Sequence, residues 1–281
     1  MPTRRPATDA RPRHTRQGPA PAPGQALPAL SAEELADLLS LVKGADSVEL
    51  KLSVPDSGLR SAVSALDMDP LEAQIRQVVF FDTPHLSLLE LGIVLRARRI
   101  QRKPGDTVVK LRPVVPDALP ADLRESPSFS VEVDAMPGGF VCSGSMKAAH
   151  DDAEIKDALV GRKPLRKLFT KEQRAFFSAN APEGLKLDDL ARLGPINVLK
   201  LKFMPAGFGR RMVAELWNYP DGSRVLELST KCSPDEAFAV AAESKVFLAS
   251  RGIDLLAEQQ TKTRSALDFF ARELATAAAD G

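Results

Sequence analysis

Cysteine and histidine are scarce in this 281-residue sequence. The two cysteines, Cys142 and Cys232, lie far apart, and neither belongs to a close cysteine or cysteine–histidine spacing. The three histidines, His14, His85 and His150, match no catalytic triad and no metal-binding pattern. A disulfide framework and a zinc site are therefore not expected.

Long apolar runs are also missing. No run reaches the length of a transmembrane helix, and no signal-peptide core follows the N-terminal arginines. The formal net charge is +1, so the overall electrostatic field indicates neither a nucleic-acid nor a membrane partner. There is no internal repeat and no glycine-rich phosphate-binding loop. We therefore expect a cytoplasmic protein without a membrane or nucleic-acid partner.

Residues 1–30 differ from the rest of the chain. They contain seven prolines and five arginines, with almost no apolar side chain to bury. This composition predicts a disordered arm. The arm either is a solvated tail or contacts anions through its arginines.

The most informative stretch is residues 47–53, Ser-Val-Glu-Leu-Lys-Leu-Ser. Its alternation predicts a β-strand with Val48, Leu50 and Leu52 on one face and the polar residues on the other. The same alternation, with charged residues on one face, returns on later predicted strands. The charged pairs are Arg96 and Arg98, Lys110 and Arg112, Glu132 and Asp134, Lys200 and Lys202, and Glu227 and Lys231.

Each polar face alone would be typical of a solvent-exposed strand. Their repetition, with cations and carboxylates mixed, predicts a β-barrel whose polar side faces inward. Burying so many charges is costly, so such a lumen is expected to hold a charged ligand and a metal ion.

The other patterns predict helices between and after the strands. Helices are expected over 31–44, 59–66, 86–91, 153–160, 164–177, 234–250 and 264–279, and strands over 47–53, 77–82, 93–99, 107–112, 129–133, 197–203, 211–217 and 224–231. Residues 104–106, Pro-Gly-Asp, predict a turn. We therefore expect one domain over 31–281, with a helical insertion near 150–195 and C-terminal helices.

In order along the chain, these segments resemble the CYTH superfamily, also called the triphosphate tunnel metalloenzymes. The resemblance covers residues from about 45 to about 265, and its centre, 80–98, is its most specific part. The segments that carry it are 47–51 (Ser-Val-Glu-Leu-Lys), 80–84 (Phe-Phe-Asp-Thr-Pro), 95–98 (Leu-Arg-Ala-Arg), 107–110 (Thr-Val-Val-Lys), 131–134 (Val-Glu-Val-Asp), 226–228 (Leu-Glu-Leu) and 261–263 (Thr-Lys-Thr).

The resemblance implies an α+β fold in which an eight-stranded antiparallel β-barrel, with helices packed outside, binds a triphosphate group and a divalent metal. It assigns phosphate contacts to basic residues and metal ligation to carboxylates, with Glu49 and Lys51 as catalytic residues. The phosphate-binding set is Lys51, Arg96, Arg98, Lys110, Arg112, Lys200, Lys202, Lys231 and Lys262, and the metal set is Glu49, Glu132, Asp134 and Glu227. Oxygen ligands suit Mg²⁺ or Mn²⁺, and arginine forks and lysines suit phosphate oxygens.

Ser47 departs from the family pattern, because it stands where the first glutamate of the Glu-x-Glu-x-Lys signature is expected. Ser229 marks a second lost carboxylate if the late acidic strand carries two. A hydroxyl is a poorer magnesium ligand than a carboxylate. Asp82, in contrast, is interpreted as a turn former and not as a ligand.

The resemblance implies a phosphohydrolase that cleaves a triphosphate-containing substrate or inorganic tri- or polyphosphate with the help of a metal. The loss at Ser47 leaves open a non-catalytic module that binds polyphosphate or a nucleotide. An adenylyl cyclase acting on a nucleoside triphosphate is a further alternative. The sequence does not indicate the oligomeric state.

Overall fold

The computed structural model of the protein describes residues 31–257, 259 and 262–279. The predicted arm at 1–30 and Thr261 of the last family motif lie outside the described residues.

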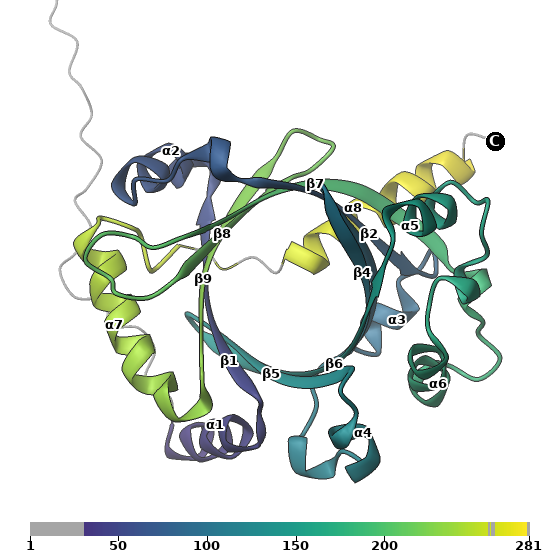
Figure 1. The fold of residues 1–281 in the computed structure, drawn as a ribbon, viewed down its shortest axis with the longest axis horizontal. Coiled ribbons are helices and arrows are strands. Elements are labelled where there is room, and N and C mark those ends of the chain that lie inside the picture. Colours follow the sequence, from purple (N-terminus) through teal and green to yellow (C-terminus); the bar gives the residue numbers. More distant parts are fainter. Residues whose placement is uncertain (1–30, 258, 260–261, 280–281) are drawn as a thin grey trace, which may run out of the picture.

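Nine strands form a closed barrel, which Figure 1 shows as a ring. They are β1 (Ser47–Pro55), β2 (Gln74–Asp82), β3 (Ile93–Ile100), β4 (Lys103–Leu111), β5 (Phe129–Met136), β6 (Gly139–His150), β7 (Ala191–Phe203), β8 (Met212–Asn218) and β9 (Arg224–Cys232). Their order around the barrel is β1-β5-β6-β4-β3-β2-β7-β8-β9. The predicted α+β barrel fold is confirmed, but it has nine strands where eight were expected.

The barrel is also not purely antiparallel, because β1 and β5 run parallel to each other. This pair places Ser47 opposite Glu132 and Glu49 opposite Asp134. The chain passes through β2, β3 and β4 before it returns as β5, so no short hairpin had to join the two strands. The parallel pair therefore brings together acidic residues that are about 85 positions apart in the sequence.

Strand β6 was not predicted from the sequence. Its 12 residues include glycine, serine and alanine, and they lack the continuous β-branched signal on which the other predictions depended. Backbone pairing with β4 on one side and β5 on the other holds these residues in a strand. The turn predicted at 104–106 is also wrong, since these residues lie inside β4.

Eight α-helices of the described residues lie outside the barrel wall or next to its openings (Figure 1). They are α1 (Ala32–Gly44), α2 (Asp56–Ala65), α3 (Ser87–Glu90), α4 (Ala121–Glu125), α5 (Asp152–Leu159), α6 (Lys171–Asn180), α7 (Ala237–Ser250) and α8 (Lys262–Ala279). The helix predicted over 164–177 is interrupted, because Thr170 caps α6 in a reciprocal capping box with Gln173. The outward side chains of the strands pack against the helices and form the hydrophobic core.

The connection from β2 to β3 depends on Asp82, which is 1% exposed. Its carboxylate accepts hydrogen bonds from the backbone N–H groups of Thr83 (2.7 Å), Leu88 (2.9 Å) and Leu89 (2.9 Å). These contacts satisfy donors at the start of α3 and fix the chain before it enters β3. The interpretation of Asp82 as a turn former is therefore confirmed.

We expect Asp82→Ala to lower the free energy of unfolding by about 3 kcal/mol, because it leaves buried N–H groups without an acceptor. Asp69→Ala is the matched control, since Asp69 accepts one exposed bond from the N–H of Leu71. Urea unfolding followed by circular dichroism measures both. Equal losses for the two variants would contradict the structural role given to Asp82.

Candidate functional site: the central cavity

The barrel encloses a cavity of about 520 Å³, called the central cavity below. Alternate residues of the strands point into it, as the alternation of β1 illustrates: Glu49, Lys51 and Ser53 line the cavity. All thirteen site residues named from the sequence line this cavity. They are Glu49, Lys51, Arg96, Arg98, Lys110, Arg112, Glu132, Asp134, Lys200, Lys202, Glu227, Lys231 and Lys262.

Positive charge dominates this lining. Twelve basic side chains and five carboxylates of the described residues line the cavity. The basic residues are Lys51, Arg76, Arg96, Arg98, Lys110, Arg112, Lys147, Lys200, Lys202, Arg211, Lys231 and Lys262, and the carboxylates are Glu49, Glu132, Asp134, Glu215 and Glu227. Such an excess of cations in a low-dielectric enclosure favours a bound polyanion.

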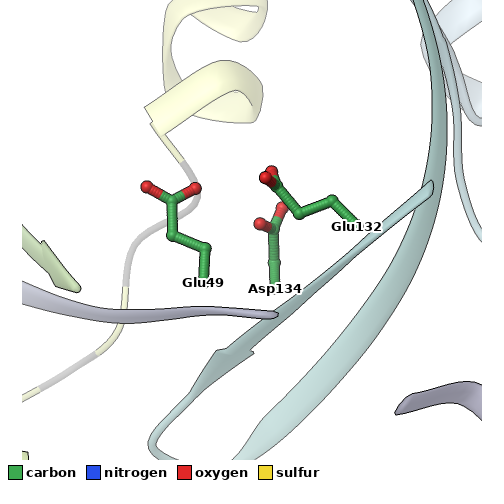
Figure 2. Close-up of side chains that lie close together, drawn as sticks. All are labelled: Glu49, Glu132 and Asp134. Atoms are coloured by element: carbon green, nitrogen blue, oxygen red, sulfur yellow. The ribbon is translucent and has the colours of Figure 1, made fainter. Parts of the chain in front are cut away.

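One group of three carboxylates lies on the parallel pair of strands. Figure 2 shows Glu49 of β1 and Glu132 and Asp134 of β5 pointing toward one another, and one oxygen of each lies within 4.8 Å of the others. Lys51 Nζ lies 2.8 Å from Asp134 Oδ1 and 3.1 Å from Glu49 Oε2. Lys110 Nζ approaches Asp134 Oδ2 at 3.3 Å. This arrangement is called the carboxylate cluster below.

A second charged group lies on β7, β8, β9 and the start of α8. Lys262 Nζ bridges Glu215 Oε2 at 2.8 Å and Glu227 Oε1 at 2.6 Å, and it lies 4.9 Å from the centre of the Trp217 ring. Lys200 Nζ binds the other oxygen of Glu215 at 2.7 Å. The structure thus groups Glu227 with Glu215 and Lys262, and not with the three carboxylates of the cluster.

The arginines of β3 form a third part of the lining. Arg98 forms an ion pair with Asp106 of β4, and Arg96 lies 3.8 Å from the same carboxylate. Arg96 Nε is buried and has no hydrogen-bond partner among the described residues. Burial removed the hydrogen bond that this N–H group makes to water, and no protein acceptor replaces it. The group is therefore well suited to donate a hydrogen bond to an anionic oxygen.

Lys231 of the lining pairs with Glu132, whereas four other cations form no ion pair among the described residues. Arg112, Lys147, Lys202 and Arg211 line the cavity and form no ion pair with a described carboxylate. Lys147, Lys202 and Arg211 are exposed. Exposed cations around a cavity attract anions from solution and guide them inward.

The two serines that depart from the family pattern both contact the carboxylate cluster. Ser47 Oγ lies 3.5 Å from Glu132 Oε2, and Ser229 Oγ donates a hydrogen bond to Glu49 Oε1 at 2.9 Å. Each hydroxyl adds a hydrogen bond to a carboxylate without adding negative charge. The cluster therefore carries less negative charge than it would with four or five carboxylates.

The pKa values of the cluster follow its ion pairs. Burial disfavours ionised Asp134, but Lys110 and Lys51 outweigh burial and lower its pKa to about 2. Burial likewise opposes the charged form of Lys51, yet Asp134 and Glu49 raise the pKa of Lys51 well above its ordinary value. The pKa of Lys110 is lowered instead, because burial and the neighbouring cations Lys51 and Arg112 outweigh the attraction of Asp134.

Burial and neighbouring charges also set the pKa values of Glu215, in the second charged group, and of Arg96, among the arginines of β3. Burial disfavours ionised Glu215, but Lys262 and Lys200 hold its pKa well below the usual range. Burial and the positive charge of Arg98 lower the pKa of Arg96. Asp134 and Glu215 are thus stabilised in their charged form, whereas Arg96 and Lys110 remain under-compensated cations. An added anion would stabilise both.

Several charged residues of this lining were not predicted from the sequence. Arg76 was missed because β2 begins at Gln74, three residues before the predicted strand. Lys147 lies on β6, which was not predicted, and Glu215 lies on β8 between Val213 and Trp217, where no second charge drew attention to it. Extending the alternation of β2 backward from Val78 would have found Arg76.

The carboxylate cluster fits a divalent ion such as Mg²⁺ or Mn²⁺. Such ions prefer oxygen ligands, and three carboxylates with converging oxygens supply part of the coordination shell. The residues that would hold the ion are Glu49, Glu132 and Asp134. The ammonium of Lys51, in contact with two of them, lies where it can pair with a phosphate beside the ion.

The sequence matches no protein-family model and no curated protein. Two solved structures resemble the fold. An adenylyl cyclase-like protein from Hippeastrum, described as having a dominant triphosphatase activity, has a TM-score of 0.58 at 16% identity over 77% of this chain and 92% of that chain. An adenylate cyclase-like protein from Bacillus halodurans has a TM-score of 0.52 at 13% identity over 77% of this chain and 96% of that chain. Identities this low establish the likeness of the fold and not the activity.

None of the described helices combines the length and the hydropathy required to cross a membrane.

We predict that ionised Asp134 stabilises the folded protein at neutral pH and that this contribution is lost in acid. Its pKa is about 2 in the folded protein, against an ordinary value of 3.8, so its stabilising effect is present above pH 4 and is lost as the pH falls toward 2. The shift corresponds to about 2 kcal/mol. Asp134→Asn should lower the free energy of unfolding at pH 7 by about that amount and should flatten its pH dependence below pH 4.

Chemical denaturation in metal-free buffer at several pH values measures the effect. The control is Asp122→Asn, at an exposed position of α4. The free energy of unfolding of Asp134→Asn could instead fall as steeply below pH 4 as that of the parent protein. That result would contradict the ion pairs described for the cluster.

Proposed function

We propose that the central cavity binds a triphosphate group and that the protein hydrolyses it with a divalent metal, as a member of the CYTH superfamily. The observation that carries the proposal is the lining of the closed barrel, where twelve cations surround five carboxylates. A linear triphosphate carries several negative charges and matches that excess. The fold neighbour from Hippeastrum, described as having a dominant triphosphatase activity, supports the same reading.

The basic residues are assigned to the phosphate chain. Arg96 and Arg98 would give forked contacts to phosphate oxygens, and Lys51 and Lys110 would add compact charges next to the carboxylate cluster. Lys200, Lys202, Lys231, Lys262 and Arg112 would complete the set. Anion binding would also relieve the repulsion between Arg96 and Arg98, which face the same cavity.

Glu49, Glu132 and Asp134 are assigned to the metal. When bound there, the ion would withdraw charge from the phosphate oxygens and orient a water molecule. Lys51 and Lys110 hold the pKa of Asp134 below its ordinary value, so this carboxylate is available as a ligand at neutral pH. Lys51 would hold the phosphate next to the carboxylates, and Ser229 would fix the position of Glu49. Glu227 is assigned to positioning Lys262 rather than to the metal.

A non-catalytic binding module is the second candidate. The observation that favours it is that Ser47 and Ser229 bring hydroxyls, and no further charge, to the cluster. Metal affinity would then be too low for turnover, while the cationic lining would still bind polyphosphate or a nucleotide. An adenylyl cyclase would share the cavity and convert a nucleoside triphosphate to a cyclic nucleotide.

One panel of reactions separates these functions. Tripolyphosphate, polyphosphate and nucleoside triphosphates are incubated with Mg²⁺ or Mn²⁺, and released phosphate and cyclic nucleotide are measured for the parent protein and for Glu49→Ala. Metal-dependent phosphate release that is lost in Glu49→Ala supports the hydrolase. Tight binding without turnover identifies the binding module, and cyclic nucleotide identifies the cyclase.

Arg96→Ala tests the phosphate contact separately from catalysis. We expect the dissociation constant for tripolyphosphate, measured calorimetrically without metal, to rise about tenfold or more, because a charged hydrogen bond is lost. Arg102→Ala is the control, since Arg102 is exposed and is not part of the cavity lining. If the two substitutions have the same effect, Arg96 does not contact the ligand.

Ser47→Glu tests the departure from the family pattern. Since Ser47 Oγ lies 3.5 Å from Glu132 Oε2, a glutamate at this position would add a fourth carboxylate to the cluster. We expect a lower melting temperature without metal, from carboxylate repulsion, and a larger stabilisation by Mn²⁺ than in the parent protein. Phosphate release should then increase or appear.

The measurement for Ser47→Glu is thermal unfolding and phosphate release as a function of Mn²⁺ concentration. Ser126→Glu, on the loop before β5, controls for a nonspecific effect of added charge. An unchanged response to Mn²⁺ in a folded Ser47→Glu protein would mean that position 47 does not face the metal site.

A further inference from the structure

A second cavity of about 230 Å³ lies outside the barrel, between helix α7 and the outer face of the strands. Figure 1 shows α7 beside β9, on the side of the wall opposite to the central cavity. On β1, Leu50 and Leu52 line this outer cavity, whereas Glu49 and Ser53 on either side of them line the central one. Lys51, between Leu50 and Leu52, borders both cavities. The β1–β9 wall therefore lies between the two cavities, and Met136 also borders both.

The outer cavity exists because α7 has small side chains between its large apolar ones. Val240 of α7 packs into one hydrophobic core cluster, and Phe247 and Leu248 pack into another. Between them the helix presents Ala241 and Ser244, both small, to the barrel wall. The two clusters therefore do not meet behind β1 and β9, and an apolar space remains. Unfilled space of this size is uncommon in a protein interior, because its lining loses packing contacts.

Two polar groups in this lining have no partner. Thr230 of β9 is 3% exposed and Ser244 of α7 is 8% exposed, and neither hydroxyl has a hydrogen-bond partner among the described residues. A buried hydroxyl without a partner is costly, so a bound molecule that hydrogen-bonds to both would recover that free energy. Lys245, next to Ser244 and exposed, also lines the cavity and adds a positive charge.

We propose that the outer cavity binds a small carboxylate with an apolar body. The apolar walls, which include Leu52, Leu228 and Leu248, take the body, and the hydroxyls of Thr230 and Ser244 donate to the carboxylate, which also pairs with Lys245. The volume is larger than the roughly 150 Å³ cavity that accommodates benzene in another protein, so a chain of about eight carbons fits. This site does not depend on the function of the central cavity.

Octanoate is the probe, and octanol is its uncharged counterpart. We expect saturable binding of one octanoate per chain by isothermal titration calorimetry, with a rise in melting temperature. Ala241→Phe fills the cavity and should abolish binding, whereas Ala242→Phe, at the next and exposed position of α7, should leave it unchanged. Absence of saturable octanoate binding to the parent protein would overturn the proposal, with the cavity then holding water only.

Two further variants test the polar contacts without adding volume. Thr230→Val with Ser244→Ala should weaken octanoate binding about tenfold. Lys245→Gln should weaken octanoate about threefold and leave octanol unchanged, and Lys156→Gln, on the distant helix α5, should change neither. Each variant is checked for an unchanged fold by its circular dichroism spectrum. If the hydroxyl and lysine variants bind octanoate as the parent does, the assigned site is wrong.

Discussion

Repulsion between like charges in a closed lumen is the constraint on which the rest of this structure depends. Twelve cations line the central cavity, and five carboxylates offset them only in part. The barrel wall must therefore be stabilised from outside. The outward side chains of the strands pack with α1, α6 and α7 into buried clusters. Stability and function are divided between the two faces of the same strands, since hydrophobic burial stabilises the outer face and leaves the inner face free to carry charge.

The carboxylates are placed so that they moderate this repulsion without removing it. Asp134 lies between Lys51 and Lys110, and Glu215 lies between Lys200 and Lys262. Arg96, whose Nε has no partner among the described residues and whose nearest carboxylate oxygen is 3.8 Å away, is only partly compensated. Lys202 forms no ion pair with a described carboxylate. A cavity of this kind is preorganised for an anion, because most of the free energy needed to gather the cations has been supplied by folding.

Much of this arrangement could be predicted from the sequence, because a period of two is a direct signal of which residues share a face. That signal led to Glu49 and Lys51, to Arg96 and Arg98, and to the idea of a charged lumen. It failed at β6, where small residues carry little preference for a strand, and for Arg76, just before the predicted start of β2. It could not reveal that β1 and β5 run parallel, nor that Lys262 joins Glu215 and Glu227, because these contacts connect distant segments and depend on barrel closure. The outer cavity behind α7 was equally hidden, since an alanine and a serine in a helix do not by themselves indicate a space.

The most direct test of the central claim is a crystal structure of the protein grown with tripolyphosphate and Mn²⁺, using the anomalous signal of manganese to locate the ion. We expect a phosphate chain inside the barrel, with its oxygens on Arg96 and Arg98, and a manganese peak at Glu49, Glu132 and Asp134. Phosphate density confined to the outer surface of the barrel, with no manganese peak at the carboxylate cluster at saturating concentrations, would contradict it.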